Sequence, residues 1–314
     1  MYISASPENV DIFRLGRIVS RDDDSDHFGI IENIKIETNT ETGDYLTVSG
    51  RFLTCLLERR IIYPTMSVSG NYGFIVQSLI RSNCIDSGVR TIPGLILGKV
   101  SGKCWERKTR LQVSYENLME YTYKLCELIG GSVNIRNEGD ALVCDLFQGT
   151  DRSILQSENP HIIFSDDYNN LLSFTYAADN SIQKNFAYVF GSGEGSARKK
   201  STFYNGTEPA YFDRYEVYSD QRNLTQDDKA TDAEYLEMLT EKGKESIVLP
   251  QTASESTIAP FSTQFEYNRD YFVGDYVTVE NKRFGLIQKK IQLVGMIESF
   301  DSNGRSLTPT FKEG

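Results

Sequence analysis

Paired acidic residues are the first features of this sequence that could do chemistry. Asp166-Asp167 and Asp227-Asp228 are adjacent, and two carboxylates can supply the acid and the base of a hydrolase. Adjacent residues of a strand point to opposite faces, so we do not expect either pair to act on one bond. The run from Asp22 to Asp26 resembles a calcium loop, but it lacks the central Gly and the closing Glu, and we favour a solvated turn.

Cysteine and histidine could supply nucleophiles or metal ligands. The two histidines exclude a His-rich metal site, and His161, which precedes an apolar run, is interpreted as structural. The odd number of cysteines, the absence of a C-x-x-C pair and the lack of a secretory signal predict reduced thiols in a chain made in a cytoplasm. Cys55 and Cys126 occupy apolar helical positions, which predicts burial. The remaining cysteines are Cys84, Cys104 and Cys144.

Glycine-rich and basic segments could bind anions. Gly191–Ser196 (GSGEGS) lacks a following Gly-Lys-Ser or Gly-Lys-Thr and a helix, so we predict a hairpin loop rather than a phosphate loop. Arg198–Lys200 could line a surface or pair with Glu194. Arg59-Arg60 could bind an anion, although we favour a solvated or salt-bridging helix face. We therefore predict no catalytic, cofactor-binding or metal-binding residue, and we predict that the protein is not an enzyme.

The composition limits the class of protein. A chain of 314 residues can form two or three packed units, and 39% hydrophobic with 25% charged residues is ordinary for a globular protein. A formal net charge of −11 argues against nucleic acid or an anionic membrane surface as the main partner, because both attract basic proteins. An acidic lumen through which DNA slides is compatible with this charge. No apolar run reaches the roughly 18 residues of a membrane span, so no membrane anchor is expected.

The elements that must position these residues are predicted to be mainly β. Short alternating runs separated by Gly, Asn and Asp predict strands over residues 12–18, 27–38, 45–48, 132–136, 141–147, 161–164, 171–176, 186–190, 199–204, 261–267, 276–280, 284–300 and 306–311. Residues 249–260, rich in Ser, Thr and Ala, are predicted to be a loop, and Asp301–Gly304 a hairpin turn.

Helical spacing predicts four amphipathic helices among these strands. They cover Phe52–Ile62 before Pro64, Ser69–Arg81, a segment capped by Ser114 and ended by Gly130-Gly131, and part of residues 221–245. We expect Phe74 on the buried side of the second helix, and Ala233, Leu236 and Leu239 on one face of the fourth. Gly43–Val48 and Gly274–Val279 match at five of six positions, which hints at two similar β units. Trp105 is interpreted as a core or interface anchor.

Five separated segments, in order, carry a resemblance to a known family. They are Leu46–Thr65 (LTVSGRFLTCLLERRIIYPT), Ala187–Arg198 (AYVFGSGEGSAR), Phe212–Leu224 (FDRYEVYSDQRNL), Val273–Val279 (VGDYVTV) and Leu307–Phe311 (LTPTF). Together they resemble the Gp37-like family of siphovirus and prophage tail proteins, which is similar to baseplate hub proteins of the gene-product-27 type. Each segment alone would be weak evidence, whereas their order over most of the chain makes the resemblance specific.

The resemblance implies a mainly β (α+β) fold with two antiparallel β-barrel domains that carry small α/β and helical insertions. We expect a first barrel in residues 1–110, an α+β insertion in 111–155, a second barrel in 156–220 and 256–314, and a helical insertion in 221–255. Two barrels per chain would let a homotrimer imitate sixfold symmetry. The chain ends at Gly314, so we expect no attached peptidase or lysozyme domain.

The implied function is that of a structural baseplate hub in a phage tail or a phage-tail-like particle such as a tailocin or contractile injection system. Its expected partners are the tail tube protein, a spike or tail-tip protein and other baseplate proteins, in a particle assembled in the host cytoplasm. Two alternatives stay open. The abundant Tyr and Phe allow a carbohydrate-binding module for a host surface, and the acidic pairs allow, with less support, a tail-associated hydrolase.

Overall fold

The computed structural model describes the whole chain except Asp23, Ser25, Thr42, residues 226–230 and 259–263, Ser302, Asn303 and Gly314, with the main chain alone for 251–257, Leu286, Asp301 and Glu313. The described chain is mainly β, as predicted, and it divides into two compact units. The first comprises Met1–Ser101, Val113–Cys126 and Val133–Phe147, and the second Gly102–Gln112, Glu127–Ser132 and Gln148–Gly314. The five-segment domain division expected from the sequence remains a prediction.

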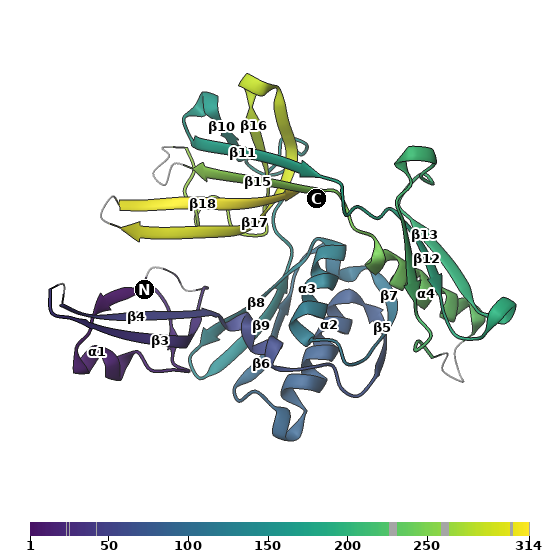
Figure 1. The fold of residues 1–314 in the computed structure, drawn as a ribbon, viewed down its shortest axis with the longest axis horizontal. Helices are drawn as coiled ribbons and strands as arrows, with labels where there is room; N and C mark the ends of the chain where they lie inside the picture. The colour runs from purple at the N-terminus through teal and green to yellow at the C-terminus, as the bar shows by residue number, and fades with distance from the viewer. Residues whose placement is uncertain are drawn as a thin grey trace. The chain divides into compact units, whose positions relative to one another are not determined.

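The first unit begins with a four-stranded antiparallel sheet in the order β1-β4-β3-β2, of which Figure 1 labels β3 and β4. Its strands are β1 (Tyr2–Ser4), β2 (Ile18–Val19), β3 (Gly29–Asn39) and β4 (Gly43–Phe52). Asn39 pairs with Gly43, so the strands predicted over 27–38 and 45–48 form a hairpin and run closer to its turn than expected. Ile31, Leu46 and Val48 form the core of this sheet.

The predicted strand over residues 12–18 is wrong. A helix, α1 (Pro7–Ile12), occupies the start of this region, and only Ile18 enters a strand. The side chain of Ser6 accepts a hydrogen bond from the Asn9 N–H, and Pro7 stands at the beginning of the helix, where its fixed φ is favourable. This local capping outweighs the weak apolar alternation that suggested a strand.

The predicted helix over 52–62 is shorter than expected and is a 3-10 helix, η1 (Leu53–Arg59). It buries Leu53, Leu56 and Leu57, as expected of an amphipathic helix. The chain after it turns extended because it pairs with a later segment: the Ile62 N–H donates to the Glu116 carbonyl at 2.9 Å, and the Leu118 N–H donates to the Arg60 carbonyl at 2.9 Å. Pro64 therefore lies beyond a helix that has already ended.

The rest of the first unit combines helices with a three-stranded sheet in the order β6-β9-β8. Its elements are β5 (Met66–Asn71), α2 (Tyr72–Ile80), a π-helical turn η2 (Arg81–Ile85), η3 (Gly88–Arg90), β6 (Leu95–Val100), α3 (Leu118–Ile129), β8 (Ser132–Glu138) and β9 (Ala141–Phe147). The strands predicted over 132–136 and 141–147 are thus confirmed.

Two details of these helices differ from the sequence prediction. Phe74 is 55% exposed, because the Asn71 side chain accepts from the Phe74 N–H and starts α2 at Tyr72. Asn117 rather than Ser114 caps α3, since its side-chain oxygen accepts from the N–H groups of Met119 and Glu120 at 3.0 and 3.2 Å.

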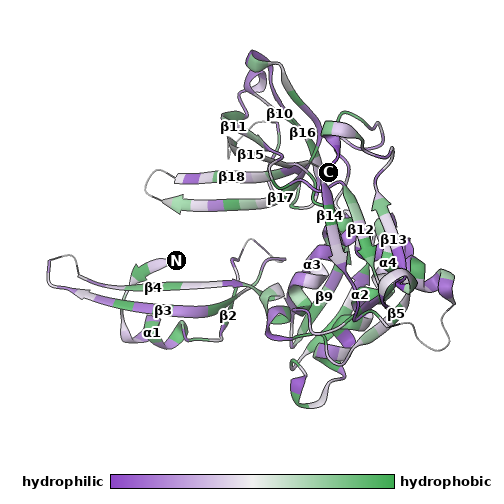
Figure 2. Ribbon diagram, turned by 45° about the vertical axis from the view of Figure 1, so that its right-hand side comes forward, coloured by the Kyte–Doolittle hydropathy of each residue, from purple (hydrophilic) through white to green (hydrophobic). Residues whose placement is uncertain are grey.

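The second unit contains a six-stranded sheet in the order β10-β16-β17-β18-β15-β11 (Figure 1). Its strands are β10 (Ile163–Ser165), β11 (Leu171–Asp179), β15 (Gln251–Ile258), β16 (Tyr276–Asn281), β17 (Leu286–Asp301) and β18 (Gly304–Glu313). Phe164, Tyr271 and Phe311 are central in its core, where the ring of Phe164 lies 5.3 Å from that of Tyr271 and 5.9 Å from that of Phe311. Figure 2 shows apolar and polar residues mixed along β17.

This sheet is open rather than closed. Among the described strands, β10 and β11 end the order and are not hydrogen-bonded to each other, so the sheet resembles a half-barrel. The two closed antiparallel barrels implied by the resemblance are therefore not confirmed, and the pairing of β10 with β16 is parallel.

The loop predicted for residues 249–260 is wrong, because β15 occupies its centre and lies between β11 and β18. Ser254 pairs with Tyr176 on one side and with Phe311 on the other. Of the strand predicted over 261–267, the first three residues lie outside the described chain, and the described part is not a strand. Asp301 pairs with Gly304, as the predicted hairpin requires, although Ser302 and Asn303 lie outside the described residues.

A second, smaller sheet of this unit carries helix α4 on one face (Figure 1). Its order is β13-β12-β14, with β12 (Phe186–Phe190) antiparallel to β13 (Lys200–Tyr204) and parallel to β14 (Glu216–Asp220). Helix α4 (Asp232–Ser246) starts at a capping box formed by Thr231 and Glu234. The remaining elements are η4 (Lys103–Glu106), β7 (Lys108–Val113), η5 (Asp166–Tyr168), η6 (Gly195–Ala197), η7 (Tyr211–Asp213) and η8 (Lys282–Phe284).

The buried face of α4 differs from the predicted one. Tyr235, Met238 and Leu239 pack on the sheet, whereas Ala233 and Leu236 are exposed. The helix can lie close to the sheet because Gly243 has no side chain: a Cβ there would lie 2.7 Å from the Phe203 Cβ. The prediction left Tyr235 out of the apolar face, so the expected face was rotated about the helix axis relative to the observed one.

Candidate functional site

The acidic pair Asp166-Asp167 forms ion pairs instead of a catalytic dyad. Asp167 lies 2.6 Å from the Lys282 ammonium, and Asp166 lies 3.6 Å from Nε of Arg283. Both carboxylates belong to the short helix η5, which ties the start of β11 to η8. The other candidate pair, Asp227-Asp228, lies outside the described residues.

The described residues of the run from Asp22 to Asp26, which do not include Ser25, form a turn, as favoured from the sequence. The Asp24 carboxylate accepts hydrogen bonds from the N–H groups of Asp26 and His27 at 3.1 and 3.0 Å, and it contacts the His27 ring nitrogen Nδ1 at 2.8 Å. Asp23 lies outside the described residues. Across the part of the chain that the structure describes, no group of three or more His, Cys, Asp or Glu side chains is placed to hold a metal ion.

The cysteines are free and buried, as expected for reduced thiols. Burial raises the pKa of the Cys84 thiol to about 11 and that of Cys144 to about 12, so neither is a thiolate nucleophile at neutral pH. Trp105 is also buried, in agreement with its interpretation as a core anchor. His161 is exposed, and its Nε2 lies 2.8 Å from the Gln156 carbonyl oxygen.

The glycine-rich and basic segments are structural. Gly191–Ser196 lies in the loop between the antiparallel strands β12 and β13, as predicted, and its helix η6 is a single three-residue turn. Arg198 pairs with Asp220 and donates from Nε to the Gly191 carbonyl at 2.8 Å, while Lys199 lies 2.6 Å from Asp232. The pairing with Glu194 considered from the sequence is therefore replaced by other partners.

Arg59 and Arg60 also serve the fold, as favoured. Arg59 lies 3.6 Å from the Glu32 carboxylate. Arg60 donates from Nε to the Arg90 carbonyl at 2.6 Å.

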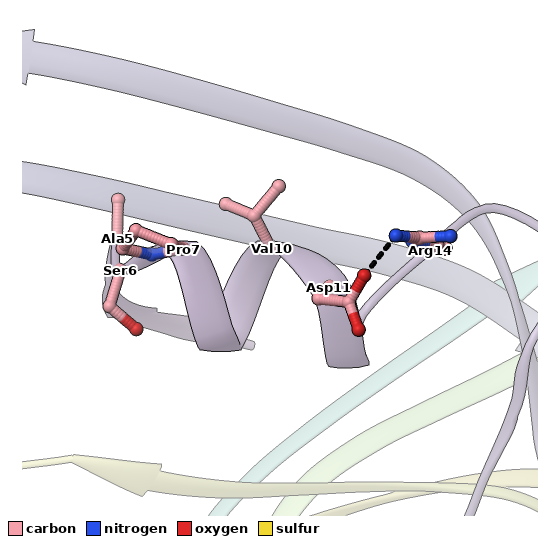
Figure 3. Close-up of a pocket in the computed structure, with 6 residues that line it drawn as sticks. All are labelled: Ala5, Ser6, Pro7, Val10, Asp11 and Arg14. Carbon is pink, nitrogen blue, oxygen red and sulfur yellow. Dashed lines mark hydrogen bonds and ion pairs between the residues drawn. The ribbon is translucent and has the colours of Figure 1, made fainter.

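A pocket of about 480 Å³ lies beside α1 (Figure 3). Ala5, Pro7 and Val10 supply its apolar wall, and Asp11 and Arg14 form an ion pair at its end. The pair neutralises both charges, and the pocket contains neither a nucleophile with an adjacent base nor a set of metal ligands. Its chemistry is that of an open surface hollow rather than of a catalytic site.

Aromatic residues on the face of the small sheet opposite α4 are covered by cations of the same chain. The Arg214 guanidinium lies 3.6 Å from the centre of the Phe186 ring, and Arg198 and Lys200 lie 5.4 and 5.1 Å from that of Phe190. These rings therefore stack with the protein's own charges. This arrangement does not favour a row of bare rings for sugars.

Two features that the sequence analysis missed are exposed apolar surfaces. Tyr211 and Phe212, which we call the aromatic tip, are 95% and 98% exposed between β13 and β14. Strand β11 pairs only with β15 among the described strands and carries the exposed side chains of Leu172 and Tyr176. The available signals were the position of Tyr211-Phe212 in a polar loop after Pro209, and the absence of Lys, Arg and Pro from Leu171–Ala178.

Comparisons with known proteins find one matching family and several similar folds. The sequence matches the family model described as Siphovirus ReqiPepy6 Gp37-like protein over residues 2–311. The fold is similar to that of a tail protein from Neisseria meningitidis MC58, with a TM-score of 0.56, 12% identity, and coverage of 92% of this chain and 80% of that one. It is also similar to the 43 kDa tail protein of prophage MuSo2 from Shewanella oneidensis, with a TM-score of 0.52, 13% identity, and coverage of 90% and 78%.

No curated protein sequence matches this chain significantly. In the described residues, no helix has both the length and the hydropathy needed to cross a bilayer.

Proposed function

Because the chain belongs to the Siphovirus ReqiPepy6 Gp37-like family of phage tail proteins, we propose that it is a structural baseplate hub of a phage tail or phage-tail-like particle. In this proposal three copies form a pseudo-sixfold ring that joins the tail tube to a central spike or tail-tip protein. The match of one family model to residues 2–311 is the observation that carries the proposal, since it involves nearly the whole chain.

The edge of the six-stranded sheet supports an assembly role. An apolar edge strand without Lys, Arg or Pro is a template for pairing with another chain, and soluble proteins usually protect such edges. Strand β11 has this composition from Leu171 to Ala178, and its side chains beyond Leu171 are largely exposed. A partner strand on this edge would extend the open sheet from one copy to the next. Repeated contacts of this kind close a ring when their rotation allows it.

The ion pairing of Asp166 and Asp167 supports a structural role over an enzymatic one. The net charge of −11 is compatible with a lumen that lets DNA pass without binding it. We therefore propose a virion or particle component that acts through contacts with the tube, the spike and other baseplate proteins.

Cryo-electron microscopy of the purified parent particle tests this function. We expect three copies of the chain at the junction of tube and spike, with β11 of each copy next to a strand of its neighbour. A position away from this junction, or a copy number other than three, would contradict the hub. Turnover of peptidoglycan by the purified chain, abolished by Asp167→Asn, would favour the hydrolase alternative instead.

A further inference from the structure

The aromatic tip is held in a conformation that presents two rings to solvent. Tyr211 has a φ of 53°, in the left-handed region that bulky residues rarely adopt, yet its side chain is 95% exposed. Phe212 is 98% exposed. A strained backbone persists only where the surrounding structure imposes it, and such positions concentrate at functional sites. Here the strain is not offset by burial of either ring within the chain.

Contacts at the base of the tip impose this conformation. Arg214 donates from Nη1 to Glu208 at 2.8 Å and to the Pro209 carbonyl at 3.1 Å, and from Nε to Glu216 at 2.6 Å. Its guanidinium stacks on the Phe186 ring of β12 at 3.6 Å. These contacts fix both ends of the loop to the sheet, so the two rings are preorganised for binding.

A second set of bonds fixes the following residue. Asn185 donates from its side-chain amide to the Asp213 carbonyl at 2.6 Å and accepts from the Tyr215 N–H at 2.9 Å. The chain immediately after Phe212 is therefore held by the residue that precedes β12. A partner would not have to order the loop, which reduces the entropic cost of binding.

We propose that the aromatic tip inserts into an apolar pocket, rimmed by Lys or Arg, on a different protein of the tail. Rigid, exposed aromatic side chains are the residues that most often dominate protein–protein binding. The segment Glu208–Glu216 carries three carboxylates and one guanidinium, and that guanidinium already pairs with two of the carboxylates. These three carboxylates, of Glu208, Asp213 and Glu216, form what we call the acidic collar of the tip. Its excess negative charge complements a rim of Lys or Arg side chains on the partner.

The charge of the collar separates this partner from two others. A second copy of this chain carries a net charge of −11, and an anionic membrane surface is also negative, so both disfavour an acidic tip. The inference rests on the proposed function, because it requires that the chain be part of a tail.

Photocrosslinking in the assembled particle identifies the partner. Phe212→p-benzoylphenylalanine is introduced in the full chain, parent particles are purified and irradiated, and the crosslinked peptides are mapped by mass spectrometry. We expect a crosslink to a Lys- or Arg-containing peptide of another tail protein. A crosslink only to a second copy or to lipid, or no crosslink in particles that contain the chain, would overturn the inference. Particles that lack the wild-type chain would instead refute the proposed function.

A competition experiment measures the contribution of the tip. Wild-type chain and the double variant Tyr211→Ala/Phe212→Ala are co-expressed with distinguishable tags, and their ratio in particles is compared with that in the lysate. We expect the variant to be depleted about tenfold or more, because both anchors are lost. The matched control is Phe284→Ala, which removes a 74% exposed ring from η8 and should leave the ratio near one. Equal ratios for both variants would overturn the inference.

Discussion

Asp275 joins two segments of the second unit, and its substitution tests how much one buried carboxylate contributes to stability. Its side chain is 5% exposed, and it accepts hydrogen bonds from the Thr150 N–H at 2.7 Å, from Arg152 Nε at 2.9 Å and from the Phe272 N–H at 3.1 Å. The two backbones touch here, since a Cβ on Gly149 would lie 1.9 Å from the Gly274 carbonyl oxygen. The carboxylate thus holds the chain that enters the six-stranded sheet against the start of β16.

Asp275→Asn should destabilise the second unit by about 3 kcal/mol, at the lower end of what removal of one partner costs in a buried ion pair. The amide retains the size of the carboxylate but loses its charge, and it turns an NH2 group toward groups that are themselves donors. Arg152, whose side chain is 18% exposed, then keeps a charge without its counter-ion. The stability of a whole domain is only about 5–15 kcal/mol, so this loss is easily measured.

Urea denaturation provides the assay, with the fluorescence of Trp105 as the reporter, because this lone tryptophan is buried in the same unit. The matched control is Asp44→Asn, followed by circular dichroism. Asp44 occupies the equivalent place in the repeated Gly-Asp-Tyr motif but is exposed, so its substitution should change the free energy of unfolding by less than about 0.5 kcal/mol. The reasoning fails if Asp275→Asn changes the free energy of unfolding as little as the control does. It also fails if Asp275→Asn lowers this free energy as much in an Arg152→Met background as in the wild type.

Three further predictions concern thiols, acid and assembly. Burial raises the thiol pKa values of Cys84 and Cys144 to about 11 and 12. Both thiols should therefore react with Ellman's reagent at pH 8 at least about tenfold more slowly in the native chain than in denaturant. Equal reaction rates would contradict their burial. Hydrogen bonds from Arg51 to Glu32 and from the Thr231 N–H to Glu234 hold the pKa of each carboxyl below its ordinary value. The stability that these two carboxylates contribute is therefore present above about pH 4.5 and is lost as the pH falls through the lowered pKa values. A melting temperature that stays constant down to pH 3 would refute this pH dependence. Ala177→Lys on the exposed edge strand β11 should leave the melting temperature within about 2 °C but reduce incorporation into particles about tenfold, and normal incorporation would argue against pairing at this edge.

The sequence predicted an element correctly where neighbouring residues alone determine its backbone conformation. Phe186–Phe190 was predicted as a strand to the residue, because it is a β-forming run that ends at a glycine cluster. The strands predicted over 27–38 and 45–48 likewise correspond to β3 and β4, which meet at a turn where Gly43 adopts a φ of 95°. In both cases the residues that determine the backbone lie within the element or next to it.

Long-range pairing explains the main failures. The Ser, Thr and Ala of β15 have little preference of their own, and the strand exists because β11 and β18, both distant in sequence, pair with it. The residues after Arg59 leave the helix because residues 115–118 offer them hydrogen bonds. The aromatic tip was missed as well, because aromatic residues are buried by default and this expectation outweighed the signal of its polar loop after Pro209; the structure shows both rings in solvent.

The repeated Gly-Asp-Tyr motif shows which features of a strand a short sequence determines and which it does not. Gly43 and Gly274 have φ angles of 95° and 104°, so the same residue type creates the same left-handed entry to a strand in both copies. The strands then acquire different neighbours: β4 lies between two antiparallel strands, whereas β16 lies between the parallel β10 and the antiparallel β17. The aspartate that follows is exposed in the first copy and binds Arg152 in the second. A motif of six residues can therefore specify how a strand begins, while in the second copy the parallel partner strand and the role of the aspartate depend on segments more than a hundred residues away.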